Sequence, residues 1–393
     1  MLTSEEAIAM FQKRCEANPQ DYLSASVLGQ LYMRHAREEH DEDAFGTAEA
    51  VFRRALEINP QHFASRVHLA NALNSQHKFA EAAAEAEQCL EKKPRSELAL
   101  AALGDAQLEL GQYEAARETF AKLEAESSSP PVWARLARLA ELEGEIDAAQ
   151  ALLERSLAHV EEKSVPVETV WYRFRLGDFL FRIGELELAD AQLSTALELN
   201  PDHHPSLITL SRVRSAQNRH QAAIGLLRQV VDLTPHFDLV AELSDLYELA
   251  GDDQMAAETL HKATETAASI EDVTLEGRHL ALFYADHNLE PELAAKIARE
   301  DLARRQDVYA WDTLAWTLCQ NNEFDEAIKA SEHALRLGTR DAQIYFHRAM
   351  IHSKRGEEKL ARQWIAKVAE LNPAFSPTHH KSMDRLLATV HSL

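Results

Sequence analysis

One alanine returns at intervals of about 34 residues along almost the whole chain. Its ten occurrences are Ala48, Ala82, Ala116, Ala149, Ala189, Ala223, Ala256, Ala294, Ala327 and Ala361. Self-similarity at a fixed period of this length indicates an array of stacked units instead of one globular core. Each unit of such an array contacts its neighbours, and the array offers an extended surface for binding.

Each unit has the pattern of two helices joined by a tight turn. If the ten units begin at residues 22, 63, 97, 130, 170, 204, 237, 274, 308 and 342, position 8 is always Gly, Ala or Ser and position 20 is the recurrent alanine. Small residues at fixed points let two successive helices pack closely. Position 15 is Gly or Asn in eight units and His77 in one, and Gly and Asn tolerate the left-handed backbone just past a helix end. Proline at position 32 of five units marks where the second helix stops.

These residues resemble the tetratricopeptide repeat (TPR), and the resemblance covers roughly residues 5–373. The fifth unit carries the pattern as Leu176-Gly177, Ala189, Ala196 and Pro201, and the last as Tyr345, Ala349, Ala361 and Pro373. The segment Asp312-Thr313-Leu314-Ala315-Trp316 is similar to bacterial multi-repeat arrays of no assigned function. The resemblance implies an all-α, right-handed superhelical solenoid of about ten helix–turn–helix units. The eighth unit fits least well, because it needs one inserted residue before Ala294.

The expected organisation is one continuous array with a capping helix at each end. Residues 1–20 match the second half of a repeat and are predicted to form the N-terminal cap. TPR units 1–4 are assigned to residues 21–161, and units 5–10 continue over 162–373. Residues 374–393 are predicted to form the C-terminal cap, because the terminal apolar face of an array must be covered. The apolar residues of that helix recur at i, i+3, i+4 and i+7, namely Met383, Leu386, Leu387 and Val390.

The charge balance of the chain is strongly acidic, with 41 Lys and Arg against 64 Asp and Glu and a formal net charge of −23. Helical repeats that bind RNA need a basic face, so nucleic acid is not expected as a partner. The acidic excess favours a basic peptide or protein through electrostatic steering; a solvated acidic coat is the alternative. No apolar stretch approaches the ~18 residues of a membrane helix. We expect a cytoplasmic protein, exported only if the given start is a processed or trimmed end.

Catalytic and metal-binding motifs are not evident in the sequence. The chain has no zinc-protease motif, phosphate-binding glycine loop or nucleophile elbow. Two pairs of histidines, His203-His204 and His379-His380, lie beside prolines in expected loops without a ligand at metal spacing. The sequence therefore predicts no enzyme activity, no cofactor and no metal.

The resemblance also implies that the first helix of each pair lines a concave groove, with positions 2, 5, 9 and 12 pointing inward. In the N-terminal part of this groove, Asn71 and Asn74 lie on one helical face, where side-chain amides hold peptide backbone. Ordinary solvated polar positions are the alternative. In the middle part, Arg138, Arg175 and Arg212 are suited to bind a carboxylate. Alternatively, position 9 alternates in charge from unit to unit and the groove neutralises itself.

The C-terminal part of the expected groove is apolar and aromatic, with Tyr309, Trp316, Phe346 and Met350. Aromatic and Met side chains concentrate in binding hot spots, so this patch is a candidate partner site. The alternative is that the last helix folds back and covers it.

The function expected from these features is a non-catalytic scaffold or adaptor that binds a peptide segment or partner protein in its concave groove. Two alternatives remain open: a structural protein that self-associates, or an accessory subunit of an enzyme complex.

Overall fold

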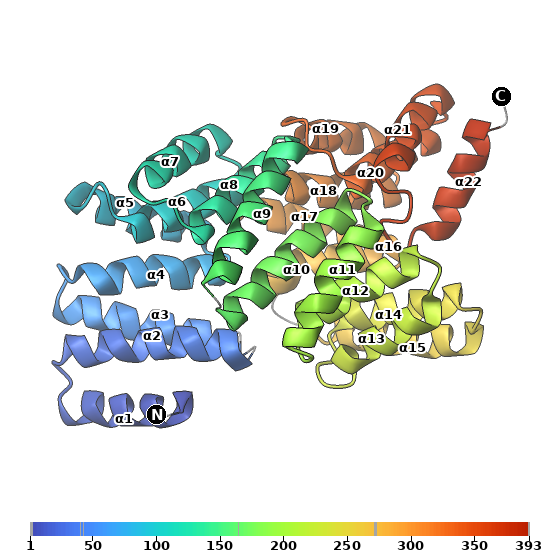
Figure 1. The fold of residues 1–393 in the computed structure, drawn as a ribbon. Helices are drawn as coiled ribbons and strands as arrows, with labels where there is room; N and C mark the ends of the chain where they lie inside the picture. The colour runs from blue at the N-terminus through green and yellow to red at the C-terminus, as the bar shows by residue number, and fades with distance from the viewer. Residues whose placement is uncertain (1–2, 40, 42, 164, 271–272, 392–393) are drawn as a thin grey trace. The chain divides into compact units, whose positions relative to one another are not determined.

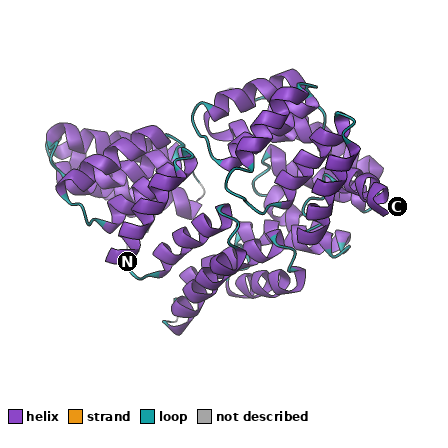
Figure 2. Ribbon diagram, turned by 90° about the horizontal axis from the view of Figure 1, so that it is seen from above, coloured by secondary structure: helices purple, strands orange, loops and turns teal. Residues whose placement is uncertain are grey.

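The computed structural model describes residues 3–39, 41, 43–163, 165–270 and 273–391. In this part of the chain every regular element is an α-helix and none is a strand (Figure 2). None of the described helices is both long and apolar enough to span a bilayer. The predicted all-α repeat fold is therefore confirmed.

The described residues form two compact units. Unit 1 consists of residues 1–128 with residues 304–307, and unit 2 consists of residues 129–303 and 308–393. Unit 1 contains α1 Ser4–Ala17, α2 Tyr22–Glu39, α3 Asp43–Ile58, α4 Phe63–Ser75, α5 Phe79–Lys92, α6 Glu97–Glu109 and α7 Tyr113–Glu126 (Figure 1). The units divide between the third and fourth repeats, and the grouping of repeats 1–4 over residues 21–161 stays a prediction.

Unit 2 contains the remaining helices. They are α8 Pro130–Leu142, α9 Ile146–Glu162, α10 Pro166–Arg182, α11 Leu186–Leu199, α12 His204–Ala216, α13 His220–Val231, α14 Phe237–Leu249, α15 Asp253–Ala268, α16 Val273–Asp286, α17 Pro291–Leu302, α18 Val308–Gln320, α19 Phe324–Ala334, α20 Ala342–Lys354, α21 Glu358–Leu371 and α22 His380–His391. The first helix of every pair begins at the predicted start of its repeat, except that α10 begins at Pro166 and α16 at Val273.

The turn inside each repeat has the left-handed residue that the sequence predicts. All nine residues at position 15 of repeats 2–10 have positive φ, from 54° at Asn288 to 85° at Gly184. In the eighth repeat a second residue, Glu290, has a positive φ of 40°. This second left-handed residue accommodates the insertion that the sequence requires before Ala294.

Close packing inside each helix pair depends on the small residues at positions 8 and 20. Nine of the ten recurrent alanines are buried, and Ala256 is partly buried. Where position 8 is glycine, a large residue of the second helix fills the space. A Cβ atom at Gly29 would lie 2.6 Å from the ring of Phe52, and one at Gly177 would lie 2.7 Å from Cγ of Leu193.

Both terminal helices are present. At α1, Thr3 and Glu6 form a reciprocal capping box that satisfies the backbone amides of the first turn. At α22, Met383 is buried and Leu386 and Leu387 are partly buried against the core of unit 2. The side chain of Val390 lies outside the described residues.

Distant repeats of unit 2 contact one another, and two hydrogen bonds join turns of the early repeats to the late ones. The side chain of Thr339 donates a hydrogen bond to the carbonyl oxygen of Leu142 at 2.5 Å, and the side-chain amide of Asn372 donates to that of Phe181 at 2.7 Å. Beside these hydrogen bonds, a Cβ atom on Gly144 would overlap the carbonyl oxygen of Gly338, and a Cβ atom on Gly184 would overlap that of Leu371. The turns of repeats 4 and 5 therefore pack against repeats 9 and 10.

A matched pair of glycine substitutions tests the role of position 8. In Gly104→Ala the new methyl group overlaps the buried ring of Phe120, and we expect a loss of about 1–3 kcal/mol in the free energy of unfolding. In Gly225→Ala the methyl group points into open space within α13, and we expect a gain of about 0.5–1 kcal/mol from helix propensity. Urea unfolding measures both, and equal effects of the two substitutions would contradict this account.

Candidate functional site

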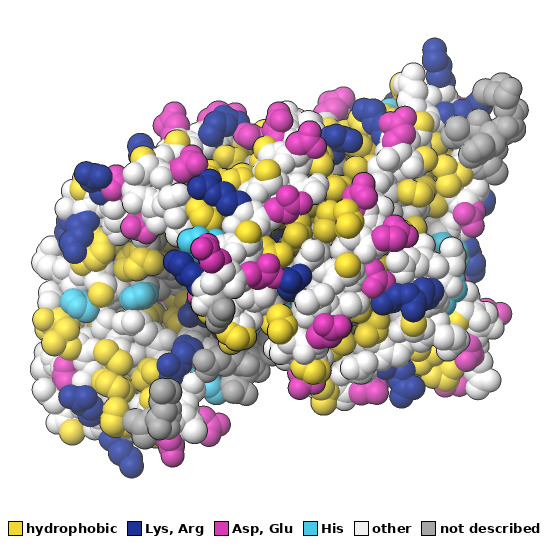
Figure 3. Space-filling model, in the orientation of Figure 1, with side chains coloured by type: hydrophobic (Ala, Val, Ile, Leu, Met, Phe, Trp, Pro, Cys, Tyr) yellow, Lys and Arg dark blue, Asp and Glu magenta, His cyan; other side chains and the backbone are white. Residues whose placement is uncertain are grey.

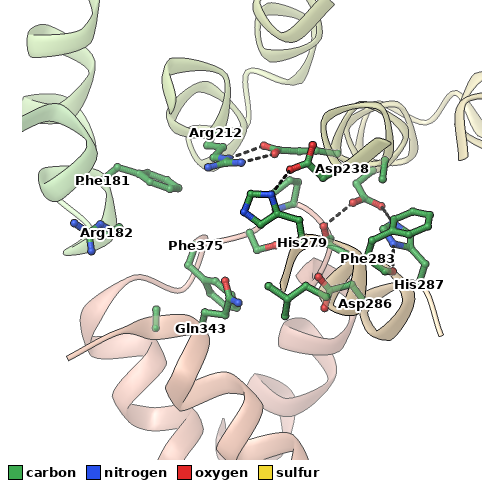
Figure 4. A pocket seen from close by; sticks show the side chains of 18 of the residues that line it. Phe181, Arg182, Arg212, Asp238, His279, Phe283, Asp286, His287, Gln343 and Phe375 are labelled. Atoms are coloured by element: carbon green, nitrogen blue, oxygen red, sulfur yellow. Dashed lines mark hydrogen bonds and ion pairs between the residues drawn. The ribbon is translucent and has the colours of Figure 1, made fainter. Parts of the chain in front are cut away.

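Unit 2 encloses a cavity of about 320 Å³ on the inner side of its superhelix. Its wall is built from α10, α12, α14 and α16, from the start of α20 and from residues 375–378, which connect α21 to α22 (Figure 4). The four long helices are each the first helix of their repeat. The cavity therefore lies on the concave side that the TPR resemblance implies.

Helices α14 and α16 supply most of the ionisable groups. On α14, Asp238, Glu242 and Asp245 follow one another at i, i+4 and i+7, so one face of the helix presents three carboxylates to the cavity. On α16, His279 and Asp286 stand at the same i, i+7 spacing on the face that lines the cavity (Figure 4).

Acidic groups outnumber basic groups in the cavity wall, and the two arginines are already paired. The acidic residues are Asp178, Asp238, Glu242, Asp245, Asp286 and Asp341, against Arg182 and Arg212. Arg212 donates two hydrogen bonds to Glu242 at 2.8 and 2.7 Å, and Arg182 pairs with Glu141 and Asp178. Counted over the Asp, Glu and Arg side chains alone, the wall has a surplus of four negative charges, which His236 and His287 offset in part.

Histidines beside the cavity respond to this acidic surplus. His236 contacts Asp238 at 2.5 Å and Glu276 at 3.2 Å, and its hydrogen bonds to these two carboxylates raise its pKa from 6.5 to about 10. Burial opposes ionisation of Asp238, but the His236 hydrogen bond and the nearby histidines hold the pKa of that carboxyl below its usual value. Asp238 is therefore a carboxylate at neutral pH.

Residues 375–379 close one side of the cavity through polar and aromatic contacts. The Thr378 hydroxyl donates a hydrogen bond to Asp245 at 2.5 Å. The ring of Phe346 lies 4.6 Å from that of His379 and 5.5 Å from that of Phe375. The segment between the last two helices is thus anchored to α14 and α20.

The same contacts overturn the expectation of an open aromatic groove. Trp316 is 2% exposed and Phe346 is not exposed, because His379 and Phe375 pack on them. Tyr309 is half-buried, with the guanidinium of Arg138 5.1 Å from its ring centre, and Met350 packs on the core of unit 2. The chain covers this patch itself, as the alternative proposed, but through Phe375 and His379, which precede α22.

Two of the three predicted arginines, Arg138 and Arg175, bind a carboxylate of the chain itself together with Arg182, which was not predicted. Arg138, Arg175 and Arg182 lie 3.2, 3.8 and 2.8 Å from the carboxylate of Glu141, which is 5% exposed. Burial disfavours its charge, but the three guanidinium groups, Arg182 foremost, lower the pKa of Glu141 from 4.5 to about 2. These arginines therefore satisfy an internal charge. Arg212 is the predicted site residue that lines the cavity.

The charged residues at position 9 pair with residues at other positions of the repeat, and not with one another as their alternating charges predict. Arg138 pairs with Glu141 on its own helix, α8. Arg212 of α12 pairs with Glu242 of α14, and neither glutamate is at position 9. Asp178 pairs with Arg182, and Asp245 lies 3.4 Å from His287. The groove does neutralise part of its charge, through partners other than those predicted.

The amide side chains of unit 1 make hydrogen bonds within the array. Asn71 donates to the carbonyl oxygen of Val67 on its own helix at 2.9 Å, and Asn74 donates to that of Ala102 on α6 at 2.9 Å. Asn74 thus joins α4 to α6, whereas the hydrogen bond of Asn71 stays within α4. A peptide-binding role for Asn71 and Asn74 stays a prediction.

Sequence reasoning missed one cluster of metal-ligand residues. Ligand atoms of Asp286, His347 and His379 lie within 4.8 Å of one another. His379 lies in the segment before α22, as predicted for a loop histidine, but it is not without ligand residues nearby, since the fold brings it to Asp286 of α16 and His347 of α20. The chain separations are too long for any local motif to signal this cluster.

Glu141 makes stability depend on pH in a defined direction. Because its pKa falls on folding, the stabilisation is complete above about pH 4.5 and is lost as the pH falls towards 2. We expect Glu141→Gln to cost about 1.5–3 kcal/mol at neutral pH, since it leaves three partly buried arginines without their carboxylate.

Urea unfolding across this pH range measures the difference between the wild type and Glu141→Gln. The difference should shrink on acidification, while the exposed control Glu145→Gln should show little effect at any pH. A constant difference between wild type and Glu141→Gln would contradict the assignment of the lowered pKa.

Comparison with known proteins also identifies the tetratricopeptide repeat in this chain. Family models described as tetratricopeptide repeat match residues 33–97, 73–129, 172–203 and 313–374. No functionally curated protein matches the sequence significantly.

Solved structures that match this chain share little sequence identity with it. Human IFIT1, determined as a dimer with m7Gppp-AAAA, is 16% identical over 84% of this chain and 77% of its own, with a TM-score of 0.55. A monomeric IFIT1 mutant with Gppp-AAAA is 16% identical over 84% of this chain and 76% of its own, with the same TM-score of 0.55. A tetratricopeptide repeat protein from Parabacteroides merdae is 16% identical over 66% of this chain and 91% of its own, with a TM-score of 0.45.

Proposed function

The chain is a tetratricopeptide repeat protein, and on this premise we propose that it is a non-catalytic adaptor that binds a basic segment of a partner protein in the acidic cavity of unit 2. Tetratricopeptide repeats generally mediate contacts between proteins. We expect the adaptor to act in the cytoplasm.

The observation that carries this proposal is the surplus of carboxylates in the cavity wall. Arg212 is occupied by Glu242, and Arg182 by Glu141 and Asp178. The wall therefore attracts cations, and a Lys or Arg side chain would donate to Asp238 and Asp245 beside the hydrogen bonds that these carboxylates already accept from His236 and Thr378.

The size of the cavity limits what enters it. A volume of about 320 Å³ is at the lower end of the range for ligand sites. It accommodates one or two side chains of a partner and not a long stretch of peptide. Binding would therefore involve an anchoring basic residue in the cavity and further contacts outside it.

The cavity wall is accessible to a partner. The side chains of His279 and Arg212 are 51% and 37% exposed, respectively. On α14 itself the side chain of Asp238 is 33% exposed, whereas those of Glu242 and Asp245 are 12% and 11% exposed, so a partner reaches the acidic face of this helix at Asp238 first.

A phosphate-bearing ligand is the wrong charge for this cavity. IFIT1 was determined with capped RNA oligonucleotides, but that likeness extends to the fold alone. The six carboxylates here repel phosphate groups, and Asp and Glu side chains are also spread over the face of the molecule drawn in Figure 3. Nucleic acid is therefore not the proposed partner.

Titration calorimetry with paired peptides tests the proposal. The probe is a short capped peptide containing adjacent Arg and Lys, and its control contains citrulline and acetyl-lysine at the same positions. We expect the basic peptide to bind and the neutral peptide not to bind. Asp238→Asn with Asp245→Asn should weaken binding by at least about tenfold, because hydrogen bonds to charged groups contribute about 1.5–3 kcal/mol each.

The matched control removes two carboxylates from the exposed surface of α15, as Glu258→Gln with Glu265→Gln. Circular dichroism checks that both double variants stay folded. If both double variants weakened peptide binding equally, the loss of affinity would come from net charge alone, and this would contradict the proposed site. Absence of peptide binding together with concentration-dependent oligomers in light scattering would favour self-association instead.

A further inference from the structure

Three ligand side chains meet where the segment between α21 and α22 packs on the rest of unit 2. Asp286 is the last residue of α16, His347 lies in the middle of α20, and His379 directly precedes α22. His347 and His379 are buried, and Asp286 is partly buried. The Nε2 atom of His379 lies 3.3 Å from Oδ1 of Asp286. In a tetrahedral site with bonds of 2.0–2.1 Å, donor atoms are separated by roughly 3.3 Å.

The orientation of His347 is fixed by a second carboxylate. Its Nδ1 lies 2.8 Å from Oδ2 of Asp312. A carboxylate accepts hydrogen bonds, so Nδ1 carries the hydrogen and donates it. Metal-binding histidines nearly always use their second ring nitrogen in this way, and the interaction selects the tautomer whose other nitrogen binds the ion.

The remaining nitrogen of His347 has no partner. Its Nε2 atom makes no hydrogen bond, although the side chain is 0% exposed. A buried polar atom without a partner is costly and rare in native proteins. The ring is held in place by Trp316, which stacks on it at 4.5 Å between centroids and donates its indole hydrogen to Asp286 at 2.7 Å. The carboxylate and both rings are thus positioned before any ligand arrives.

We propose that Asp286, His347 and His379 bind a divalent transition-metal ion, zinc in the first instance, that fastens the segment between α21 and α22 to α16 and α20. Two imidazoles and one carboxylate suit zinc and neighbouring first-row ions, whereas magnesium and calcium prefer all-oxygen ligands. Water completes the coordination. The ion supplies the missing partner of His347 and holds His379 against the core.

Calorimetry of the metal-free full chain with zinc chloride tests this site. We expect one ion per chain at high affinity, with no comparable binding of magnesium. His347→Gln and His379→Gln should each abolish this tight site, whereas His380→Gln should retain it, because His380 contacts the carbonyl oxygen of Pro377 instead. Asp312→Asn should weaken zinc binding about 10–100-fold, as expected when the carboxylate behind a histidine ligand is removed.

Two further readouts separate a specific site from binding to scattered histidines. Cobalt substitution should give visible absorption bands in the wild type and not in His347→Gln. Zinc should also protect residues 375–379 from hydrogen exchange in the wild type, and should not do so in His347→Gln. The variants are compared by thermal unfolding without metal, to confirm that they are folded.

Zinc binding of equal strength in the wild type and in His347→Gln with His379→Gln would overturn the proposal, as would the absence of any tight site. The second result would mean that a protonated His347 serves Asp286 as an internal cation. Neither result bears on peptide binding, which is measured separately with the α14 variants.

Discussion

The close approach of two helices within each repeat is the constraint on which this structure depends. Small residues at position 8 and the recurrent alanine at position 20 let the helices pack at short distance, and a single methyl group at Gly104 would overlap Phe120. Stacking of such pairs curves the array and places the first helices on its inner side. In unit 2 this curvature brings Gly144 and Gly184 against the turns of the last two repeats. The acidic cavity depends on this closure, because its wall combines α10 and α12 with the start of α20.

The fold could be predicted from the sequence because its determinants are local and repeated. The recurrent alanines, the glycine or asparagine at position 15 and the prolines at position 32 define each helix pair within 34 residues. The structure places helices at these positions and gives positive φ to all nine residues at position 15 of repeats 2–10. Even the irregular eighth repeat was located, and Glu290 with its left-handed backbone accounts for the extra residue.

The candidate site was less predictable because it depends on contacts between distant repeats. Position 9 directed attention to Arg212, which lines the cavity, but nothing local indicated that Arg138 and Arg175 turn towards Glu141. Trp316 is of a residue type that is common in binding hot spots, but in this structure it is buried under His379. Periodicity identifies which face of a helix is concave, but the covering of that face is decided by a segment more than sixty residues further along the chain.

The central claim is that a basic group of a partner binds between α14 and α16, inside a cavity closed by residues 375–378. Hydrogen exchange of the full chain with and without a basic peptide tests it most directly. The account predicts slower exchange in α14, in α16 and in the closing segment, because a bound cation links Asp238 and Asp245 and limits opening of the cavity. Protection confined to unit 1, or an exchange pattern that the peptide leaves unchanged, would contradict it.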